Sequence, residues 1–310
     1  MTAMPIGIAG YGKIARDQHA PAIAASEDFE LVAIADPEAR LESLPTYADL
    51  ATMLGDRPDI AAVALCMPPR FRAAAAREAI AAGRHVMLEK PPCATLAEAR
   101  DLVERARDAG VTLFAAWHSQ AAAAVAVARE RLAGASVRSV RVAWMEDVRV
   151  WHPGQAWIWQ TGGFGVFDPG INALSILTAI LPGTLRLSEA ELSVPSNCAT
   201  PIAARLAVEG EGGFPVAAEF DFRQTGPQSW DIEIETDRET LTLSHGGNRL
   251  RIDGVEVEVG PEGEYRALYD RFAELIRAGE SEVDLAPLEL VEGALLGGRK
   301  IAVEPFEEPA

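Results

Sequence analysis

A glycine-rich turn directly follows the first apolar run of the chain, residues 6–9, and precedes a segment with helical character. It reads Gly10-x-Gly12-x-x-Ala15. At a strand-to-helix junction the first glycine permits a tight turn, the second lets the backbone approach a pyrophosphate, and the alanine keeps helix and strand close. The pattern therefore predicts a dinucleotide site rather than a turn without a ligand. The expected contacts are Gly10, Tyr11, Gly12, Lys13 and Ile14.

Apolar runs alternate with helical stretches over the first third of the chain. The helical stretches include residues 71–82 and 96–109. Alternating units of this kind predict a parallel sheet with helices on both faces, and nearly all-apolar strands are typical of such a buried sheet. We expect an α/β fold that begins with an N-terminal Rossmann dinucleotide-binding domain over residues 1–118. The strand-like runs lie at residues 6–9, 31–35, 60–67, 86–88 and 111–115.

After a helical segment at residues 121–132 the pattern changes to longer strands of mixed polarity. Short turn signals at residues 237–238 and 246–248 separate some of them, as in hairpins. Residues 119–310 are therefore predicted to form a C-terminal α+β domain with an open, mainly antiparallel sheet, followed by an irregular tail at 304–310. The strands are expected at residues 137–147, 185–194, 203–208, 216–222, 231–235, 239–243 and 250–259. Helices are expected at residues 171–180, 265–277 and 287–299.

The charge balance restricts the partners of the chain. A formal net charge of −18 repels phosphate backbones and anionic lipids, so we expect no nucleic acid and no membrane as partner. No apolar run reaches the roughly 18 residues that cross a bilayer, and the first residues lack a basic signal region. These features predict a cytoplasmic protein with a small-molecule partner. Cys66, Cys93 and Cys198 have no metal-ligand spacing, so no metal site is expected.

Asp36 closes the second predicted strand, 21 residues after Ala15. An acidic side chain in this place can accept hydrogen bonds from the adenosine ribose, which favours NAD over NADP. Arg40 is close enough in sequence to pair with a 2′-phosphate, so NADP stays open. The structural alternative for Asp36 is a turn residue before Pro37.

Lysine is rare in this chain. Of its 28 Lys and Arg residues only Lys13, Lys90 and Lys300 are lysines. Glu89 and Lys90 follow the fourth predicted strand, and ligands of open α/β sheets bind at the carboxyl ends of the strands. A lysine there can donate to a sugar oxygen and move a proton, whereas a surface lysine before a proline turn is the alternative.

The glycine-rich turn, the Glu89-Lys90-Pro91 segment and the two-domain pattern together resemble the Gfo/Idh/MocA oxidoreductases. Residues 89–95, 151–153 and 168–175 resemble more closely the bacterial members that oxidise D-galactose or L-arabinose at C1. The resemblance implies an NAD(P)-dependent aldose 1-dehydrogenase that makes a lactone. It also implies a cis bond before Pro91, a substrate-binding and oligomerisation role for residues 119–310, and a homo-oligomer, a dimer or higher. The alternative hypotheses for the function are another pyranose or cyclitol dehydrogenase of this family, or a non-catalytic dinucleotide-binding regulator.

The resemblance also implies roles for single residues. Lys90 takes part in proton transfer and, with Glu89, in cofactor binding. Asn172 stands where many members have a histidine and orients the reacting hydroxyl, while Asp168 binds the sugar or holds Lys90. Asp168 and Asn172 share a helix face if the segment is helical, although Asp168 before Pro169 also fits a helix cap. The polar and aromatic groups expected around the sugar are His118, Glu146, Trp151, His152 and Trp230.

Overall fold

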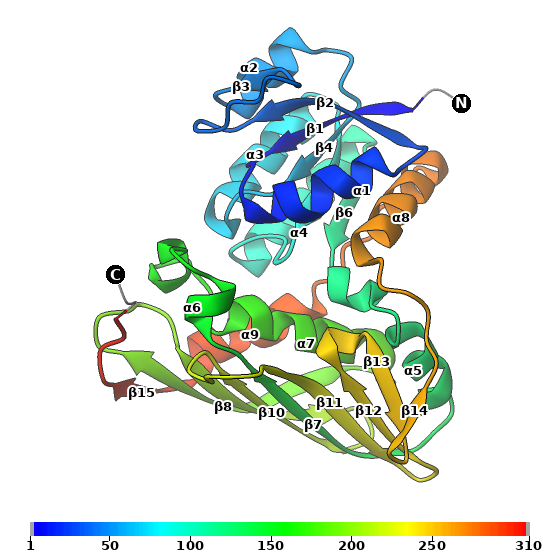
Figure 1. Cartoon of the computed structure of the whole chain (residues 1–310), viewed down its shortest axis with the longest axis vertical. Helices are drawn as coiled ribbons and strands as arrows, with labels where there is room; N and C mark the ends of the chain where they lie inside the picture. Colours follow the sequence, from blue (N-terminus) through cyan, green and yellow to red (C-terminus); the bar gives the residue numbers. More distant parts are fainter. Residues whose placement is uncertain (1–2, 308–310) are drawn as a thin grey trace. The chain divides into compact units, whose positions relative to one another are not determined.

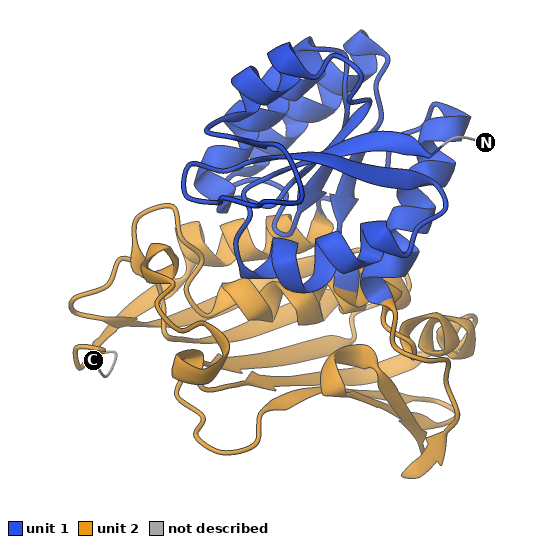
Figure 2. Cartoon of the chain, turned by 45° about the horizontal axis from the view of Figure 1, so that its top comes forward, with its two compact units in different colours: residues 1–118, 264–285 blue, residues 119–263, 286–310 orange. Residues whose placement is uncertain are grey.

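The computed structural model describes residues 3–307 and divides the chain into two compact units (Figure 2). Unit 1 comprises Met1–His118 and Glu264–Leu285, and unit 2 comprises Ser119–Gly263 and Ala286–Ala310. The first segment of unit 1 ends at His118. The expectation that all of residues 119–310 belong to the second domain differs from the structure, because the segment 264–285 is part of unit 1.

Unit 1 is built on a six-stranded sheet in which every neighbouring pair is parallel. The strand order β3-β2-β1-β4-β5-β6 is that of a Rossmann-type sheet, which confirms the predicted fold. The strand β3 has only two residues and was not expected. The strands are β1 (Met4–Ala9), β2 (Phe29–Ala35), β3 (Thr46–Tyr47), β4 (Ala62–Leu65), β5 (His85–Glu89) and β6 (Leu113–Ala116).

The helices of unit 1 pack in two groups: α1 against α8, and α3 against α2 and α4 (Figure 1). The bounds of α4 agree with the sequence prediction, because Thr95 and Glu98 form a reciprocal capping box and Gly110, at a φ of 66°, ends the helix. The π-helical segment η1 (Ala15–His19) runs directly into α1 (Ala20–Ala24). The others are α2 (Leu50–Asp56), α3 (Pro69–Ala81), α4 (Leu96–Ala109) and α8 (Glu264–Ala278).

The helix α8 joins unit 1 through its apolar face. Phe272 is fully buried and stacks on Phe29 and Phe114, with ring centroids 5.6 and 6.0 Å apart. The chain after α8 then pairs with the sheet: Glu282 accepts a backbone hydrogen bond from Ala115 and donates one to Leu113, each at 3.0 Å. This segment covers the edge of β6, which would otherwise present unpaired backbone groups.

Unit 2 contains a nine-stranded sheet in the order β14-β13-β12-β11-β7-β10-β9-β8-β15. Only β7–β10 and β8–β15 pair in parallel, which confirms the mainly antiparallel prediction. The expected strand at 250–259 is two strands, because Asp253 and Gly254 both have positive φ and form a tight turn. The strands are β7 (Val137–Met145), β8 (Leu185–Pro195), β9 (Ala203–Gly210), β10 (Pro215–Asp221), β11 (Ser229–Thr236), β12 (Thr240–Ser244), β13 (Arg249–Ile252), β14 (Val255–Val257) and β15 (Arg299–Val303).

The helices α5, α7 and α9 lie along one face of this sheet (Figure 1). Alternation in β9 shows the division of the two faces, since Leu206 and Val208 are buried while Arg205 is exposed. None of the helices in residues 3–307 is long and apolar enough to cross a membrane. The helices of unit 2 are α5 (Val125–Leu132), α6 (Val148–Trp151), α7 (Phe167–Ile180) and α9 (Ala286–Gly297), with the short turns η3 (Ala156–Trp159) and η4 (His245–Gly247). The turn η2 (His118–Ala121) begins at the last residue of the first segment of unit 1 and continues into unit 2.

Candidate active site

The glycine-rich turn follows β1 and has two different glycine positions. Gly10 has a φ of +83°, and a Cβ there would lie 2.5 Å from the backbone nitrogen of Met67, so only glycine fits. A Cβ on Gly12 would meet no atom of the described protein within 4 Å. The turn therefore packs against the protein at Gly10 and leaves free space beside Gly12. A pyrophosphate needs such space to approach the backbone.

Asp36 follows β2 and holds this turn. Its Oδ2 accepts the backbone N–H of Tyr11 at 2.7 Å, and its Oδ1 accepts those of Glu38 and Ala39 at 2.8 and 2.9 Å. Burial raises the pKa of Asp36, but these three hydrogen bonds outweigh burial and lower it overall. The carboxylate is thus ionised, and with about four lone-pair sites it can still accept a hydroxyl donor.

The basic side chains near the turn are partly committed to the protein itself. Lys13 pairs with Asp17 one helical turn away, and both side chains are exposed. Arg16 donates to the carbonyl oxygen of Tyr11 at 3.0 Å. Arg40 is exposed and donates to two carbonyl oxygens of its own loop. Each of these contacts is exposed and can exchange for contacts with an anionic ligand.

Lys90 is half-buried at the end of β5, and the Lys90–Pro91 peptide bond is cis, as the family resemblance implies. The loop is held by Arg72 of α3, which is 2% exposed. Its guanidinium donates to the carbonyl oxygens of Glu89 and Met67, each at 2.6 Å, and to that of Pro91. Arg72 thereby ties the ends of β4 and β5 together.

A buried polar cluster surrounds the residue before Lys90. The Oε2 of Glu89 accepts the backbone N–H of Lys90 at 2.6 Å. Its Oε1 accepts the hydroxyl of Tyr265 at 2.6 Å and lies 3.2 Å from Nε2 of His19. The other ring nitrogen of His19 lies 2.8 Å from the hydroxyl of Tyr269. We call His19, Glu89, Tyr265 and Tyr269 the Glu89 cluster.

The Glu89 carboxylate is ionised although it is 3% exposed. Burial raises its pKa, but the hydrogen bond and charge of His19 outweigh burial, helped by the charges of His118 and Lys90, and the pKa falls to about 2. The ring of His118 stacks on Tyr265 with centroids 5.5 Å apart, and burial lowers its pKa. His118, expected among the sugar-binding groups, therefore belongs to unit 1 and lies beside the Glu89 cluster.

A second polar cluster lies wholly in unit 2. Glu146, just after β7, is 2% exposed; its Oε1 lies 3.0 Å from Nε2 of His152 and its Oε2 accepts Nε1–H of Trp230 at 2.8 Å. The Nδ1 of His152 lies 3.6 Å from Oδ2 of Asp168 and has no hydrogen-bond partner among the described residues, although it is buried. We call Glu146, His152, Asp168 and Trp230 the Glu146 cluster.

The helix α7 carries Asp168 and Asn172 one turn apart. The residue that precedes its first turn is Val166, so Asp168 lies inside the helix and the capping alternative is wrong. A carboxylate in a first helical turn is stabilised by the helix dipole. Asn172 is half-buried, and Trp151, at 41% exposure, packs on Trp230 with ring centroids 4.7 Å apart. The structure thus brings Glu146, Trp151, His152, Asp168 and Trp230 together in unit 2, with Asn172 one helical turn after Asp168.

Four of the buried polar residues around Lys90 were not selected from the sequence. They share one property: each contacts Glu89, its loop or, for Tyr269, the Glu89 partner His19, from an element remote in the chain. His19 stands alone in the sequence, and no local pattern marks it. Two tyrosines four residues apart on one predicted helix indicate a shared face, but not what that face contacts. The residues are His19, Arg72, Tyr265 and Tyr269.

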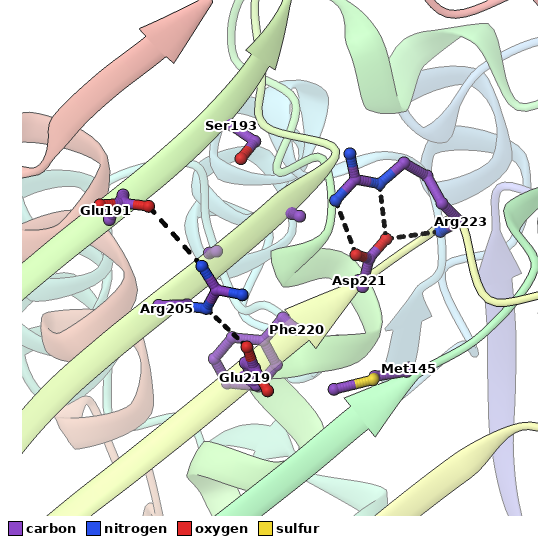
Figure 3. Close-up of a pocket in the computed structure, with 10 residues that line it drawn as sticks. Met145, Glu191, Ser193, Arg205, Glu219, Phe220, Asp221 and Arg223 are labelled. Carbon is purple, nitrogen blue, oxygen red and sulfur yellow. Dashed lines mark hydrogen bonds and ion pairs between the residues drawn. The ribbon is translucent and has the colours of Figure 1, made fainter. Parts of the chain in front are cut away.

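A shallow depression on the other face of the unit 2 sheet is unrelated to these clusters (Figure 3). Arg205 pairs with Glu219 at 2.5 Å, and Arg223 pairs with Asp221 at 2.7 Å. The third carboxylate of the lining, Glu191, pairs with Arg205 and Arg299, so each charged residue of this depression has an ion-pair partner. None of the residues selected from the sequence lines it. Within residues 3–307 no group of three or more His, Cys, Asp or Glu could hold a metal ion.

A Rossmann-type sheet and an open glycine turn at the end of β1 are the features of a dinucleotide-binding domain. Residues 4–117 match the model of the GFO_IDH_MocA oxidoreductase family with an NAD-binding Rossmann fold. The chain is 46% identical over 307 residues to a galactose 1-dehydrogenase from Pseudomonas fluorescens, which covers 99% of each chain. The chain therefore belongs to this family.

Two solved structures extend the comparison. The crystal structure of a D-galactose-1-dehydrogenase protein from Rhizobium etli has 51% sequence identity and a TM-score of 0.95, covering 99% of both chains. A 3-ketoreductase from Actinomadura kijaniata, solved with NADP and TDP-benzene, has 19% identity and a TM-score of 0.83, covering 97% of this chain and 99% of that one. The second comparison supports the fold alone.

Proposed function

We propose that this protein is an NAD(P)-dependent aldose 1-dehydrogenase that oxidises the anomeric hydroxyl of D-galactose, and of L-arabinose in its pyranose form, to the lactone. The observation that carries the proposal is the 46% identity, over 99% of both chains, to a galactose 1-dehydrogenase. We assign this chemistry to Lys90, which follows Glu89 in unit 1, and to Asp168 and Asn172 of α7 in unit 2. A homo-oligomer is part of the same proposal.

The dinucleotide fits unit 1 because Gly12 leaves open space where the backbone must approach a pyrophosphate. When bound, it supplies the acceptor for the hydride of the sugar. The ionised Asp36 favours NAD, since it can accept ribose hydroxyls and repels a 2′-phosphate. The residues assigned to cofactor binding are Gly10, Tyr11, Gly12, Lys13, Ile14, Asp36, Glu89 and Lys90.

We propose that Lys90 accepts the proton of the anomeric hydroxyl when the sugar is oxidised. Asn172 cannot accept a proton at neutral pH, so it orients the hydroxyl, and Asp168 accepts a hydrogen bond from a neighbouring one. A hemiacetal hydroxyl is more acidic than an ordinary alcohol, and a weaker base is therefore sufficient. This accounts for an asparagine in a place where many family members have a histidine.

The remaining groups are assigned to sugar recognition. Nδ1 of His152 is a buried atom without a hydrogen-bond partner among the described residues, and it suits a sugar hydroxyl. Glu146 fixes His152 through Nε2 and keeps lone pairs for a second hydroxyl. Trp151 and Trp230 offer apolar surface for the C–H face of a pyranose. His118 is assigned to the substrate by resemblance alone.

The test is a panel of aldoses and cyclitols assayed for reduced dinucleotide with NAD and with NADP. We expect activity on D-galactose and L-arabinose with formation of the lactone, and NAD used at least as well as NADP. Turnover of a cyclitol without either aldose would move the reaction to another ring hydroxyl. Dinucleotide binding without turnover of any of these compounds would favour the alternative hypothesis, a non-catalytic dinucleotide-binding regulator. Native mass spectrometry of the same preparation gives the subunit number.

A further inference from the structure

Proline pairs follow the neighbouring strands β4 and β5 at their carboxyl ends. Pro68 and Pro69 lie after β4, at the start of α3, and Pro91 and Pro92 lie after β5. Proline has no backbone N–H, so four backbone donors are missing at this edge of the sheet. The second pair is buried, and buried carbonyl oxygens need a hydrogen-bond donor. The carbonyl oxygens of these two loops are therefore short of local donors.

Arg72, in the first turn of α3, supplies donors to both loops. Its guanidinium donates to the carbonyl oxygens of Met67, in the first loop, and of Glu89 and Pro91, in the second. The same nitrogen, Nη1, donates to Glu89 and Pro91, the residues on either side of Lys90. A guanidinium is a planar fork of donors with a fixed geometry, whereas an ammonium is a compact charge on a flexible stem. The contacts of Arg72 therefore suit arginine in particular.

The contact with Met67 connects this arrangement to the glycine-rich turn. A Cβ on Gly10 would lie 2.5 Å from the backbone nitrogen of Met67, so the turn packs directly against this residue. The preceding residue, Cys66, donates its backbone N–H to the carbonyl oxygen of Ala9 at 2.8 Å. Arg72 thus contacts the loop that borders the dinucleotide turn. The loops after β1, β4 and β5 all belong to unit 1.

We propose that Arg72 is a positioning residue: it holds the backbone on both sides of Lys90 and fixes this backbone relative to the dinucleotide turn. The proposal rests on the proposed function, in which the C1–H bond of the sugar gives its hydride to the dinucleotide and the O–H bond gives its proton to Lys90. Both transfers start from adjacent atoms, so the two acceptors need a fixed separation. Arg72 is 2% exposed and acts through the backbone of the loops.

The first test is a double-variant cycle with Lys90. Arg72→Lys keeps the buried charge but loses the planar fork of donors. Because a misplacement of about 1 Å can cost about a hundredfold in rate, we expect kcat for D-galactose to fall by about tenfold or more, with little change in the Kd for the dinucleotide. In a Lys90→Met background the same change should alter kcat by less than about twofold, since Arg72 acts through Lys90. An equal fall in both backgrounds, or no fall in either, would overturn the proposal.

The matched control is Arg77→Lys, the same substitution on the same helix. Arg77 is partly exposed and pairs with Asp101 of α4 at 2.7 Å, so kcat and Kd should stay unchanged. Arg72→Gln is the second variant and offers a planar amide with two N–H donors, for which we expect the same non-additive loss. Each variant is assayed at a temperature at which thermal melting shows it to be folded. A loss in Arg77→Lys as large as that in Arg72→Lys would argue against a specific role of Arg72.

Hydrogen exchange tests the holding role without any activity. We expect Arg72→Lys to speed the exchange of backbone amides in residues 64–67 and 88–95, and Arg77→Lys to leave these rates unchanged. If the wild type oxidises no aldose, the proposed function fails, yet the exchange rates still decide whether Arg72 holds the two loops. Exchange at the rates of the wild type in both segments would refute this role.

Discussion

Glu89 and Tyr265 stand 176 positions apart in the chain and are joined by a buried hydrogen bond of 2.6 Å, in which the tyrosine hydroxyl donates to the carboxylate. The helix that carries Tyr265 comes after the whole sheet of unit 2 except β15, yet it packs on the first unit. Glu89 is thus held by two segments that are far apart in the chain, through His19 of η1 and Tyr265 of α8. A change in α8 can therefore alter the site without altering the cofactor turn.

The Glu89 cluster makes stability depend on pH. The pKa of Glu89 falls from 4.5 to about 2 on folding, so its stabilising effect is complete above about pH 4.5 and is lost as the pH falls toward 2. The pKa of His19 is raised above 6.5, so its contribution is present below that value and is lost as the pH rises through the folded pKa. The shift of Glu89 corresponds to about 3 kcal/mol.

We therefore expect Glu89→Gln to lower the free energy of unfolding at pH 6 by about 2–3 kcal/mol and by much less at pH 3. Urea unfolding of wild type and variant at both pH values measures this difference. Glu78→Gln, an exposed glutamate on α3, is the control and should unfold like the wild type at each pH. An equal loss in Glu89→Gln at pH 6 and pH 3 would show that the carboxylate contributes packing rather than charge.

Lys90→Met keeps the length of the side chain and removes its amine. We expect kcat to fall by about a hundredfold or more, the usual size of a general acid–base contribution, while the Kd for the dinucleotide stays nearly unchanged. Steady-state kinetics and fluorescence titration measure the two quantities. Lys300→Met on the exposed strand β15 is the matched control and should leave both unchanged. Near-normal turnover of Lys90→Met would remove it from the proposed mechanism.

The two glycines of the turn should respond differently to alanine. Gly10→Ala places a Cβ 2.5 Å from Met67 at a positive φ, so it should lower the melting temperature or prevent folding. Gly12→Ala meets no protein atom within 4 Å and should fold normally. Because the added methyl group fills the space assigned to the pyrophosphate, we expect it to weaken dinucleotide binding by tenfold or more. Normal binding by a folded Gly12→Ala variant would place the pyrophosphate elsewhere.

The sequence predicts where the helices and strands of this protein lie in the chain better than it predicts which elements pack against one another. The helix α4 has its own start and stop signals in Thr95, Glu98 and Gly110, and its bounds follow from them. The helix α8 is equally clear as an element, but an amphipathic helix fits any apolar surface, and its order in the chain suggested unit 2. The strands β3 and β15 were not predicted for another reason. They have only two and five residues, which are too few to show a clear pattern of apolar and polar residues.

The candidate site shows the same difference: residues that follow a predicted strand could be selected from the sequence, whereas their contacts with remote residues could not. Lys90 and Asp36 were selected because each follows a predicted strand, where ligands of a parallel sheet bind. The hydrogen bonds of Glu146 with His152 and Trp230 depend instead on the folding of three separate segments, and no spacing encodes them. His19 is the extreme example, since its partners lie 70 and 250 positions away. Contacts between remote buried groups arise from tertiary packing alone.

Asp36→Ala should shift the cofactor preference toward NADP. The change removes an ionised acceptor for the ribose hydroxyls and relieves repulsion of a 2′-phosphate, which Arg40 can then pair with. It also removes three hydrogen bonds that hold the turn, so we expect a higher KM for both cofactors. The ratio of kcat/KM for NADP to that for NAD is the measurement. Strict NADP dependence of the wild type would contradict the role given to Asp36.

The last prediction concerns sugar recognition by His152. D-galactopyranose and L-arabinopyranose share the configuration at C2, C3 and C4, whereas D-glucose has an equatorial 4-hydroxyl. If Nδ1 of His152, buried without a hydrogen-bond partner among the described residues, binds this hydroxyl, glucose leaves it unpaired at a cost of roughly 1–3 kcal/mol, or about tenfold to a hundredfold in kcat/KM. His152→Phe keeps a ring and removes both nitrogens. We expect it to lower kcat/KM for galactose and arabinose together, with glucose little affected, and equal losses for all three sugars would assign His152 a general structural role.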